Sequence, residues 1–192
     1  MATIRQGQTA LVVIDVQNDV MVNAWRRDDV IANIVKLIDR ARETETPVIF
    51  VQHEDEELVK DTGGWRFVDA LVRREDEPLI HKQYPDAFVE TEFERTLADL
   101  DVSHLVVTGA QSMACIRSTT NRAMAEGYDL TLVSDAHTTD DLDFGGVVLS
   151  AEQIVGYTNL CLQFTPYPGQ DIRVAPHDTV AFGVPLSAGK DV

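Results

Sequence analysis

Three side chains that lie far apart in this sequence could act together on a substrate: those of Cys115, Asp15 and Lys82. Cys115 follows a short apolar run and a glycine turn, and it precedes a segment of helical character that ends before Gly127. A thiol at the start of a helix meets unpaired backbone N–H groups and the positive end of the helix dipole, and both favour the thiolate. Position and residue type therefore predict that Cys115 is a nucleophile.

Asp15 and Lys82 each come directly after a short apolar run that predicts a strand. Because parallel strands end at one shared edge of a sheet, all three side chains are expected at the edge where active sites form. A desolvated carboxylate could take the thiol proton, and a fixed ammonium could hold thiolate and carboxylate in one ion cluster. Ordinary structural roles are also open: Asp15 as a turn or cap residue, Lys82 as a solvated charge and Cys115 as a core thiol.

The elements that must position these residues alternate along the chain, which is typical of βαβ units. The apolar runs predict strands over residues 9–14, 47–52, 79–81, 104–108, 128–134 and 171–175. The amphipathic segments predict helices over residues 30–41, 91–100, 115–126 and 147–163. We therefore expect one α/β domain over residues 1–192, with three α/β/α layers and an open, mostly parallel, Rossmann-like sheet of five or six strands. The pattern weakens between Gln52 and Leu79, where a substrate-covering loop is expected.

Composition limits the partners and the compartment. The net charge of −16 argues against nucleic acid and against an anionic membrane surface, since both require basic patches. Two cysteines cannot build a disulfide framework, and neither an apolar signal region nor a membrane-spanning stretch is present in the sequence. These features predict a reduced, cytoplasmic protein in which a thiol can stay free.

Three motifs in this order resemble those of the isochorismatase-like cysteine hydrolases. They are Asp-x-Gln-x-Asp starting at Asp15, Lys82 followed by Pro-x-Ala-Phe, and Val-x-Gly-x-x-x-x-x-Cys-x-Arg-Ser-Thr around Cys115. The resemblance runs from about Thr9 to about Gln163. The same superfamily contains nicotinamidases, N-carbamoylsarcosine amidases, ureidoacrylate amidohydrolases and biuret hydrolases.

The resemblance implies that Cys115, Asp15 and Lys82 form a catalytic triad that cleaves a small amide, ureide or carbamoyl C–N bond through a thioester. It also implies a cis peptide bond between Ala110 and Gln111, and an oxyanion hole made of the backbone N–H groups of Gln111 and Cys115. Relatives assemble as dimers or larger oligomers, so a homo-oligomer is expected, with the helix over residues 147–163 as a source of interface.

One departure from the family concerns metal binding. By resemblance, nicotinamidases bind a metal through an Asp-x-His pair after the second strand and a further histidine, whereas here Val51 precedes Gln52 and His53. A single histidine is a poor transition-metal site because three or more converging ligands are normally needed. The sequence therefore predicts no metal and no other cofactor.

Residues that could line the substrate pocket are polar or aromatic and lie near the predicted edge: Gln17, Trp25, His53, Trp65 and Phe88. Gln17 could instead fix the loop after the first strand, His53 could be a hydrogen-bonded loop histidine, and the aromatic residues could be core or subunit contacts. Cys161, on a predicted helix with apolar neighbours, is expected to be a packing residue.

Two other functions fit the same fold. One is an isochorismatase that cleaves a vinyl ether in an anionic ring acid. The other is a redox-sensing or regulatory protein, in which Cys115 would be exposed and Cys161 could resolve it. A dinucleotide-binding dehydrogenase is disfavoured because the first strand runs into Asp-Val-Gln instead of a G-x-G-x-x-G turn.

Overall fold

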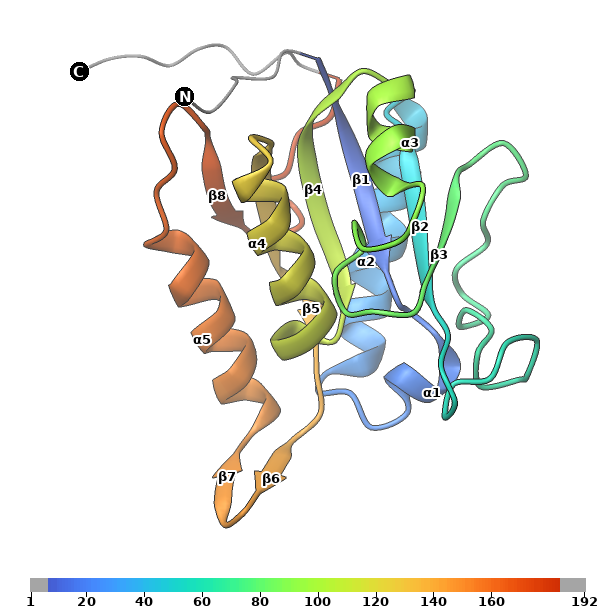
Figure 1. Ribbon diagram of the computed structural model, residues 1–192, viewed down its shortest axis with the longest axis vertical. Coiled ribbons are helices and arrows are strands. Elements are labelled where there is room, and N and C mark those ends of the chain that lie inside the picture. Colours follow the sequence, from blue (N-terminus) through green and yellow to red (C-terminus); the bar gives the residue numbers. More distant parts are fainter. Residues whose placement is uncertain (1–6, 184–192) are drawn as a thin grey trace.

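In the computed structural model, residues 7–183 are described, and six of their strands form one parallel sheet (Figure 1). The spatial order is β3-β2-β1-β4-β5-β8. The strands are β1 (Gln8–Ile14), β2 (Val48–His53), β3 (Leu79–Lys82), β4 (Val102–Ala110), β5 (Asp129–Thr138) and β8 (Ile172–Ala175). This architecture confirms the predicted α/β fold, and its strand order reverses between β1 and β4, which is where ligands bind in such sheets.

Helices cover both faces of the sheet because its strands are apolar on both sides. On one face, Leu11 and Val13 of β1 pack against α2 (Arg27–Glu43) through residues such as Ile34. On the other face, Val12 and Ile14 pack in a second core cluster with residues of three helices: α3 (Phe93–Asp99), α4 (Arg117–Ala125) and α5 (Ala151–Gln163). Figure 1 shows α2 behind the sheet and the other three in front of it. Burying each of these large apolar side chains contributes roughly 1.5–3 kcal/mol.

The strand register brings the carboxyl ends of β1 to β4 to one edge. Ile14 pairs with Val51 on one side and with Gly109 on the other, and His53 pairs with Lys82. Gly109 has a φ of +118°, and a Cβ there would lie 1.9 Å from the carbonyl oxygen of Ile14. Only glycine lets β4 pass so close to β1 at the point where the chain reaches Asp15.

Two predicted helices differ in the structure. Residues 147–149 do not start the last helix but form β7 (Val147–Leu149), which pairs antiparallel with β6 (Leu142–Phe144). The cause is the Gly145–Gly146 turn, in which both residues have positive φ, as a tight hairpin requires. Helix α5 begins only after Ser150, whose side chain forms a capping box with Gln153.

The helix predicted to start at Cys115 also begins later. A single π-helical turn, η1 (Ser112–Ile116), follows β4 and contains Cys115, and α4 starts only at Arg117. The thiol therefore lies in an irregular turn before the helix. π-Turns of this kind often occur at functional sites.

The segment between β2 and β3 contains no helix or strand within the described residues, as the weak sequence pattern predicts. Phe67 in this segment forms a β-bridge with Gln17, which lies just before the short helix α1 (Asn18–Met21). No helix within residues 7–183 combines the length and apolarity needed to span a bilayer.

Candidate active site

The three predicted catalytic side chains meet at the carboxyl edge of the sheet. Lys82 Nζ lies 2.7 Å from Asp15 Oδ2 and 3.2 Å from Cys115 Sγ. Asp15 is 1% exposed and Lys82 is 2% exposed, while Cys115 is half-buried. One ammonium group therefore contacts a carboxylate and a thiol, and the sulfur is the member of the cluster nearest to solvent.

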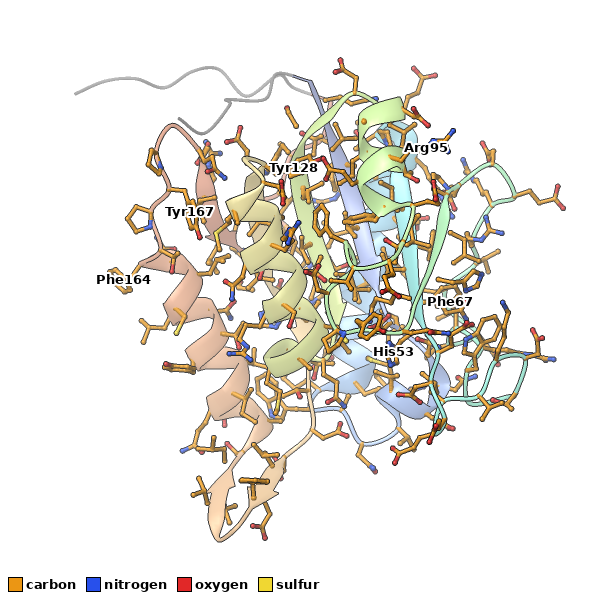
Figure 2. All side chains as sticks on the ribbon, viewed as in Figure 1. His53, Phe67, Arg95, Tyr128, Phe164 and Tyr167 are labelled. Carbon is orange, nitrogen blue, oxygen red and sulfur yellow. The ribbon has the colours of Figure 1, made fainter. Side chains whose placement is uncertain are left out.

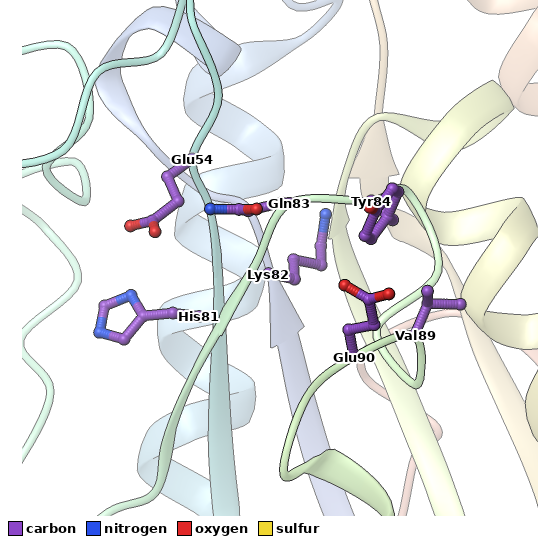
Figure 3. A pocket seen from close by; sticks show the side chains of 7 residues that line it. All are labelled: Glu54, His81, Lys82, Gln83, Tyr84, Val89 and Glu90. Atoms are coloured by element: carbon purple, nitrogen blue, oxygen red, sulfur yellow. The ribbon is translucent and has the colours of Figure 1, made fainter.

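Each of these residues is placed by the end of a strand. Asp15 follows β1 directly and adopts a φ of +50°, which turns the chain away from the sheet. Lys82 is the last residue of β3, and Figure 3 shows its side chain on the opposite side of the strand from that of His81. Cys115 lies in η1 after β4, so three separate strands supply the cluster.

The surroundings of the cluster shift the pKa values of Lys82 and Cys115 in ways that favour a charged lysine and a neutral thiol. Burial by itself lowers the pKa of Lys82, but the neighbouring Asp15 and Cys115 raise it, and the balance is a raised pKa. Burial, and next the charge of Asp15, raise the pKa of Cys115 to about 12, although Lys82 opposes this effect. The prediction that the position of Cys115 favours the thiolate is therefore wrong for the resting protein. Desolvation outweighs the field of a helix end, and Cys115 is a neutral thiol near neutral pH.

Asp15 is positioned to receive the thiol proton. Neither of its oxygens has a hydrogen-bond donor in the described part of the chain other than Lys82 and Cys115. A buried carboxylate without a network of its own can take a proton from the sulfur while the ammonium compensates the remaining charge.

The turn that leads to Cys115 contains a cis peptide bond between Ala110 and Gln111. The carbonyl group of Gln111 accepts hydrogen bonds from the backbone N–H groups of Ala114 and Ile116, which closes the turn around the cysteine. The side-chain amide of Gln111 donates to Asp140 at 3.3 Å.

His53 lies beside the cluster. Its Nδ1 is 3.2 Å from Lys82 Nζ, and its Nε2 is 3.0 Å from Asp55 Oδ2. Because an ammonium can only donate, His53 Nδ1 accepts this hydrogen bond and Nε2 carries the ring proton. Sequence reasoning left open whether His53 touches a substrate, and the geometry gives it contacts with Lys82 and Asp55.

Gln17 holds the loop over this edge. Its side-chain amide donates to the carbonyl groups of His53 and Trp65, and its side-chain oxygen accepts from the backbone N–H of His53. The residue is fully buried. These contacts correspond to the loop-fixing alternative rather than to a substrate contact.

The three aromatic residues lie in different surroundings. Trp65 stacks on His81 with ring centroids 5.7 Å apart, and Trp25 is half-buried with its backbone bonded to Thr138 and Thr139. Phe88 packs at the margin of the core, with its ring centroid 4.9 Å from that of Phe93, so it is a core contact.

A polar pocket of about 240 Å³ opens beside Lys82. Its described lining, which Figure 3 shows, consists of Glu54, His81, Lys82, Gln83, Tyr84, Val89 and Glu90. Apart from Lys82, sequence reasoning named none of these as site residues. The available signal for Glu54, His81, Gln83 and Tyr84 is their place at the carboxyl ends of β2 and β3, whereas Val89 and Glu90 carry no such signal.

Two further positions concern cysteine and metal chemistry. Cys161 is exposed on α5, so the prediction that it packs in the core is wrong, because the apolar face of this helix is not fully covered by the sheet. Among residues 7–183, no three His, Cys, Asp or Glu side chains converge in a way that could hold a metal ion.

Fold and site together define a parallel α/β protein with a thiol, a carboxylate and an ammonium at the carboxyl edge of its sheet. Residues 9–149 match the Isochorismatase domain model, and the chain belongs to this family of hydrolases.

Individual relatives support the same assignment. The chain is 32% identical over 155 residues to the uncharacterized isochorismatase family protein YddQ of Bacillus subtilis. This alignment covers 76% of this chain and 86% of that protein. It is also 32% identical to streptothricin hydrolase of Streptomyces noursei, over 73% of this chain but only 58% of that protein. An isochorismatase structure from Pseudomonas putida KT2440 superposes with a TM-score of 0.81 at 29% identity and covers 94% of each chain.

Proposed function

We propose that this protein is a cysteine amidohydrolase that cleaves the C–N bond of a small amide, ureide or carbamoyl compound. The observation that carries the proposal is the buried Lys82 ammonium in contact with both Asp15 and Cys115. A hydrolase of this kind needs a nucleophile, a proton acceptor and a fixed cation in one place.

The reaction begins when Cys115 Sγ attacks the substrate carbonyl carbon while its proton passes to Asp15. The backbone N–H groups of Gln111 and Cys115 stabilise the oxyanion that forms. Asp15 then returns the proton to the nitrogen as the C–N bond breaks, and the amine leaves. Water attacks the thioester that remains, releases the acid and restores the thiol. Lys82 stays protonated and compensates the charge that moves between sulfur and carboxylate.

The pocket beside Lys82 supports a substrate rich in N–H groups. Glu90 and Glu54 offer carboxylate acceptors there, although Glu54 also lies 3.7 Å from Lys60, and Gln83 offers an amide that can accept or donate. Lys82 is the one cation among its described lining residues. An anionic ring acid such as the substrate of an isochorismatase would face two carboxylates, so the vinyl-ether alternative is less favoured.

The redox alternative requires a low thiol pKa, because the thiolate is the form that peroxide oxidises. The pKa of Cys115 is instead raised to about 12 by burial and by Asp15. This supports a nucleophile that is deprotonated only during attack on a bound substrate.

We also propose that catalysis needs no metal ion. The lone pair of His53 Nδ1 is engaged by the Lys82 ammonium, and its Nε2–H faces Asp55. A histidine held in this way has no free nitrogen for a metal ligand bond. Activity should therefore survive dialysis against a chelator.

The test of the proposed function is hydrolysis of a panel of small amides, ureides, carbamoyl compounds and isochorismate. We expect release of amine or ammonia from at least one C–N substrate, with loss of turnover in Cys115→Ala. Cys161→Ala is the matched control, since it removes an exposed thiol on another element, and it should retain the activity. Cleavage of isochorismate alone would contradict the proposal.

We propose that the protein self-associates through what we call the α5 face: Tyr157, Leu160 and Phe164 of α5 with Phe144, Val147 and Val148 of the hairpin. Figure 2 shows Phe164 projecting away from the sheet, and 74% of this residue is exposed. Residues 153–170 contain no charged residue, although the chain carries a net charge of −16. Two copies can bring the α5 part of this face together without opposing like charges, whereas the hairpin carries the exposed Asp143. The three exposed aromatic rings alone offer about 400 Å² of apolar surface.

Light scattering tests this assembly. Tyr157→Glu with Phe164→Glu should convert a dimer or larger oligomer into monomers, because each copy would bring carboxylates into the contact. A parent protein that is monomeric at micromolar concentration would contradict it.

The two free thiols suit a reducing compartment, so we further propose a cytoplasmic location, which cell fractionation would test.

A further inference from the structure

We propose that His137 is a positioning residue of the active site, which holds the turn that presents Cys115 through a hydrogen bond to Ser112. The proposal rests on the proposed function in one respect, namely that Cys115 is the nucleophile. Neither His137 nor Ser112 takes part in the reaction steps described above.

A chain of hydrogen bonds links three elements behind the turn. His137 Nδ1 of β5 lies 2.7 Å from the hydroxyl oxygen of Ser112, the first residue of η1. His137 Nε2 lies 2.9 Å from the side-chain oxygen of Asn159 on α5. The side-chain nitrogen of Asn159 donates to the carbonyl group of Ser134 at 3.1 Å. Ser112 and His137 are both fully buried.

These contacts fix the proton on the imidazole ring. Because the Asn159 nitrogen donates to Ser134, its oxygen faces the histidine and can only accept, so His137 Nε2 carries the proton. His137 Nδ1 is then an acceptor, and the Ser112 hydroxyl group must donate to it. Burial lowers the pKa of His137 to about 4, so the ring stays neutral and keeps this arrangement near neutral pH.

The chain of hydrogen bonds ends at Ser112, three residues before the nucleophile Cys115. Ser112 follows Gln111, whose carbonyl group closes the turn by accepting from Ala114 and Ile116. His137 is paired in register with Gly109, the residue of β4 that approaches β1 beside Asp15. His137 on β5 thus holds the turn in place relative to β4, the strand that precedes the turn. In this way it fixes the 3.2 Å approach of Cys115 to Lys82.

Loss of this support should move the sulfur out of the cluster. The pKa of Cys115 is raised to about 12 by burial and by the charge of Asp15, so a displaced thiol should titrate nearer its ordinary value of 9.0. A variant that is merely less stable, but still folded throughout the pH range of the titration, would leave the titration of Cys115 unchanged. The titration therefore separates a positioning role from a structural one.

The experiment is ¹³C NMR of the Cβ of Cys115 in Cys161→Ser protein labelled at cysteine Cβ, which leaves one signal. In this background, Ser112→Ala and His137→Phe should lower the titration midpoint of Cys115 by one pH unit or more. His104→Phe is the matched control. His104, like His137, is a buried histidine whose two ring nitrogens are both hydrogen-bonded, in this case to hydroxyl groups, but it lies at the other end of β4. It should leave the midpoint where the parent has it.

An unchanged midpoint in folded Ser112→Ala would overturn the proposal, even if His137→Phe failed to fold. A shift of the same size in His104→Phe would also overturn it, because the effect would then be general destabilisation. The measurement needs no substrate. Failure of the amidohydrolase proposal would appear as a substrate panel without turnover, whatever the NMR result.

Discussion

At the scale of single residues, the site depends on the balance between Asp15, Lys82 and Cys115. A lysine side chain that is buried completely is stable only with a partner, and here Asp15 supplies the opposite charge at 2.7 Å. The thiol stays neutral because burial and the same carboxylate disfavour its anion. Removing either charged group should therefore change stability and thiol acidity in ways that can be measured separately.

Lys82→Met should destabilise the protein by about 3–5 kcal/mol, since it leaves the Asp15 carboxylate buried without a partner. Asp15→Asn combined with Lys82→Met should recover more than half of that loss, because no charge is then left unpaired. Urea unfolding measures both. Lys60→Met is the control, since Lys60 is exposed and its contact with Glu54 is long, at 3.7 Å. This substitution should change the free energy of unfolding by no more than about 0.5 kcal/mol. An additive double variant would contradict the pairing.

Asp15→Asn should make the Cys115 thiol more acidic while abolishing turnover. In the intact protein Asp15 raises the pKa of Cys115 and Lys82 lowers it, so loss of the carboxylate leaves mainly the effect of the cation. The folded protein then releases the thiol proton at lower pH than the parent does. The ¹³C signal of Cys115 should begin to shift at a lower pH in Asp15→Asn than in the parent as the pH is raised from 7, and a shift that begins at the same or a higher pH would refute the prediction.

At the scale of elements, the strands could be predicted because each contains a run rich in apolar residues, and β1, β2, β3, β4 and β8 lie within two residues of their predicted bounds. The sequence predicts a helix in place of the hairpin of β6 and β7, because Val147–Leu149 is apolar and adjoins a helical pattern, and only the Gly145–Gly146 turn marks the hairpin. The neutral state of Cys115 could not be predicted, since it depends on burial that only the packed structure creates. The sequence does not mark His137 as a site residue, although His137 lies near the end of a strand, as Lys82 does.

Gly109→Ala should destabilise the protein by at least about 2 kcal/mol, through strain at a positive φ and a clash with β1. The added Cβ would lie 1.9 Å from the carbonyl oxygen of Ile14, next to Asp15. Gly63→Ala is the matched control, because nothing lies within 4 Å of a Cβ at that position. Thermal unfolding of both variants provides the comparison, and equal melting temperatures would show that β4 does not need the glycine.

At the scale of the whole molecule, the fold buries two histidines in their neutral form. Burial lowers the pKa of His104 and of His137 from 6.5 to about 4. Between these values the unfolded chain binds protons that the folded chain does not, so the free energy of unfolding falls as the pH falls from 6.5 to 4. Each histidine accounts for up to roughly 3 kcal/mol of this loss.

His104→Phe should flatten this dependence, because one of the two protonation steps is removed. Urea unfolding at intervals from pH 7.5 to pH 4.5 gives the slope for each protein. Above pH 7 the two curves should run parallel, since both histidines are neutral in the folded and the unfolded chain there. A variant whose stability declines as steeply as that of the parent between pH 6.5 and 4.5 would contradict the assignment.

The most direct measurement is mass spectrometry of the protein quenched during turnover of a cleaved C–N substrate. We predict an added mass equal to the acyl fragment on the peptide that contains Cys115, present in Cys161→Ala and absent in Cys115→Ala. Turnover that continues at full rate in Cys115→Ala, with no acyl group on the parent protein, would contradict a thioester formed beside Asp15 and Lys82.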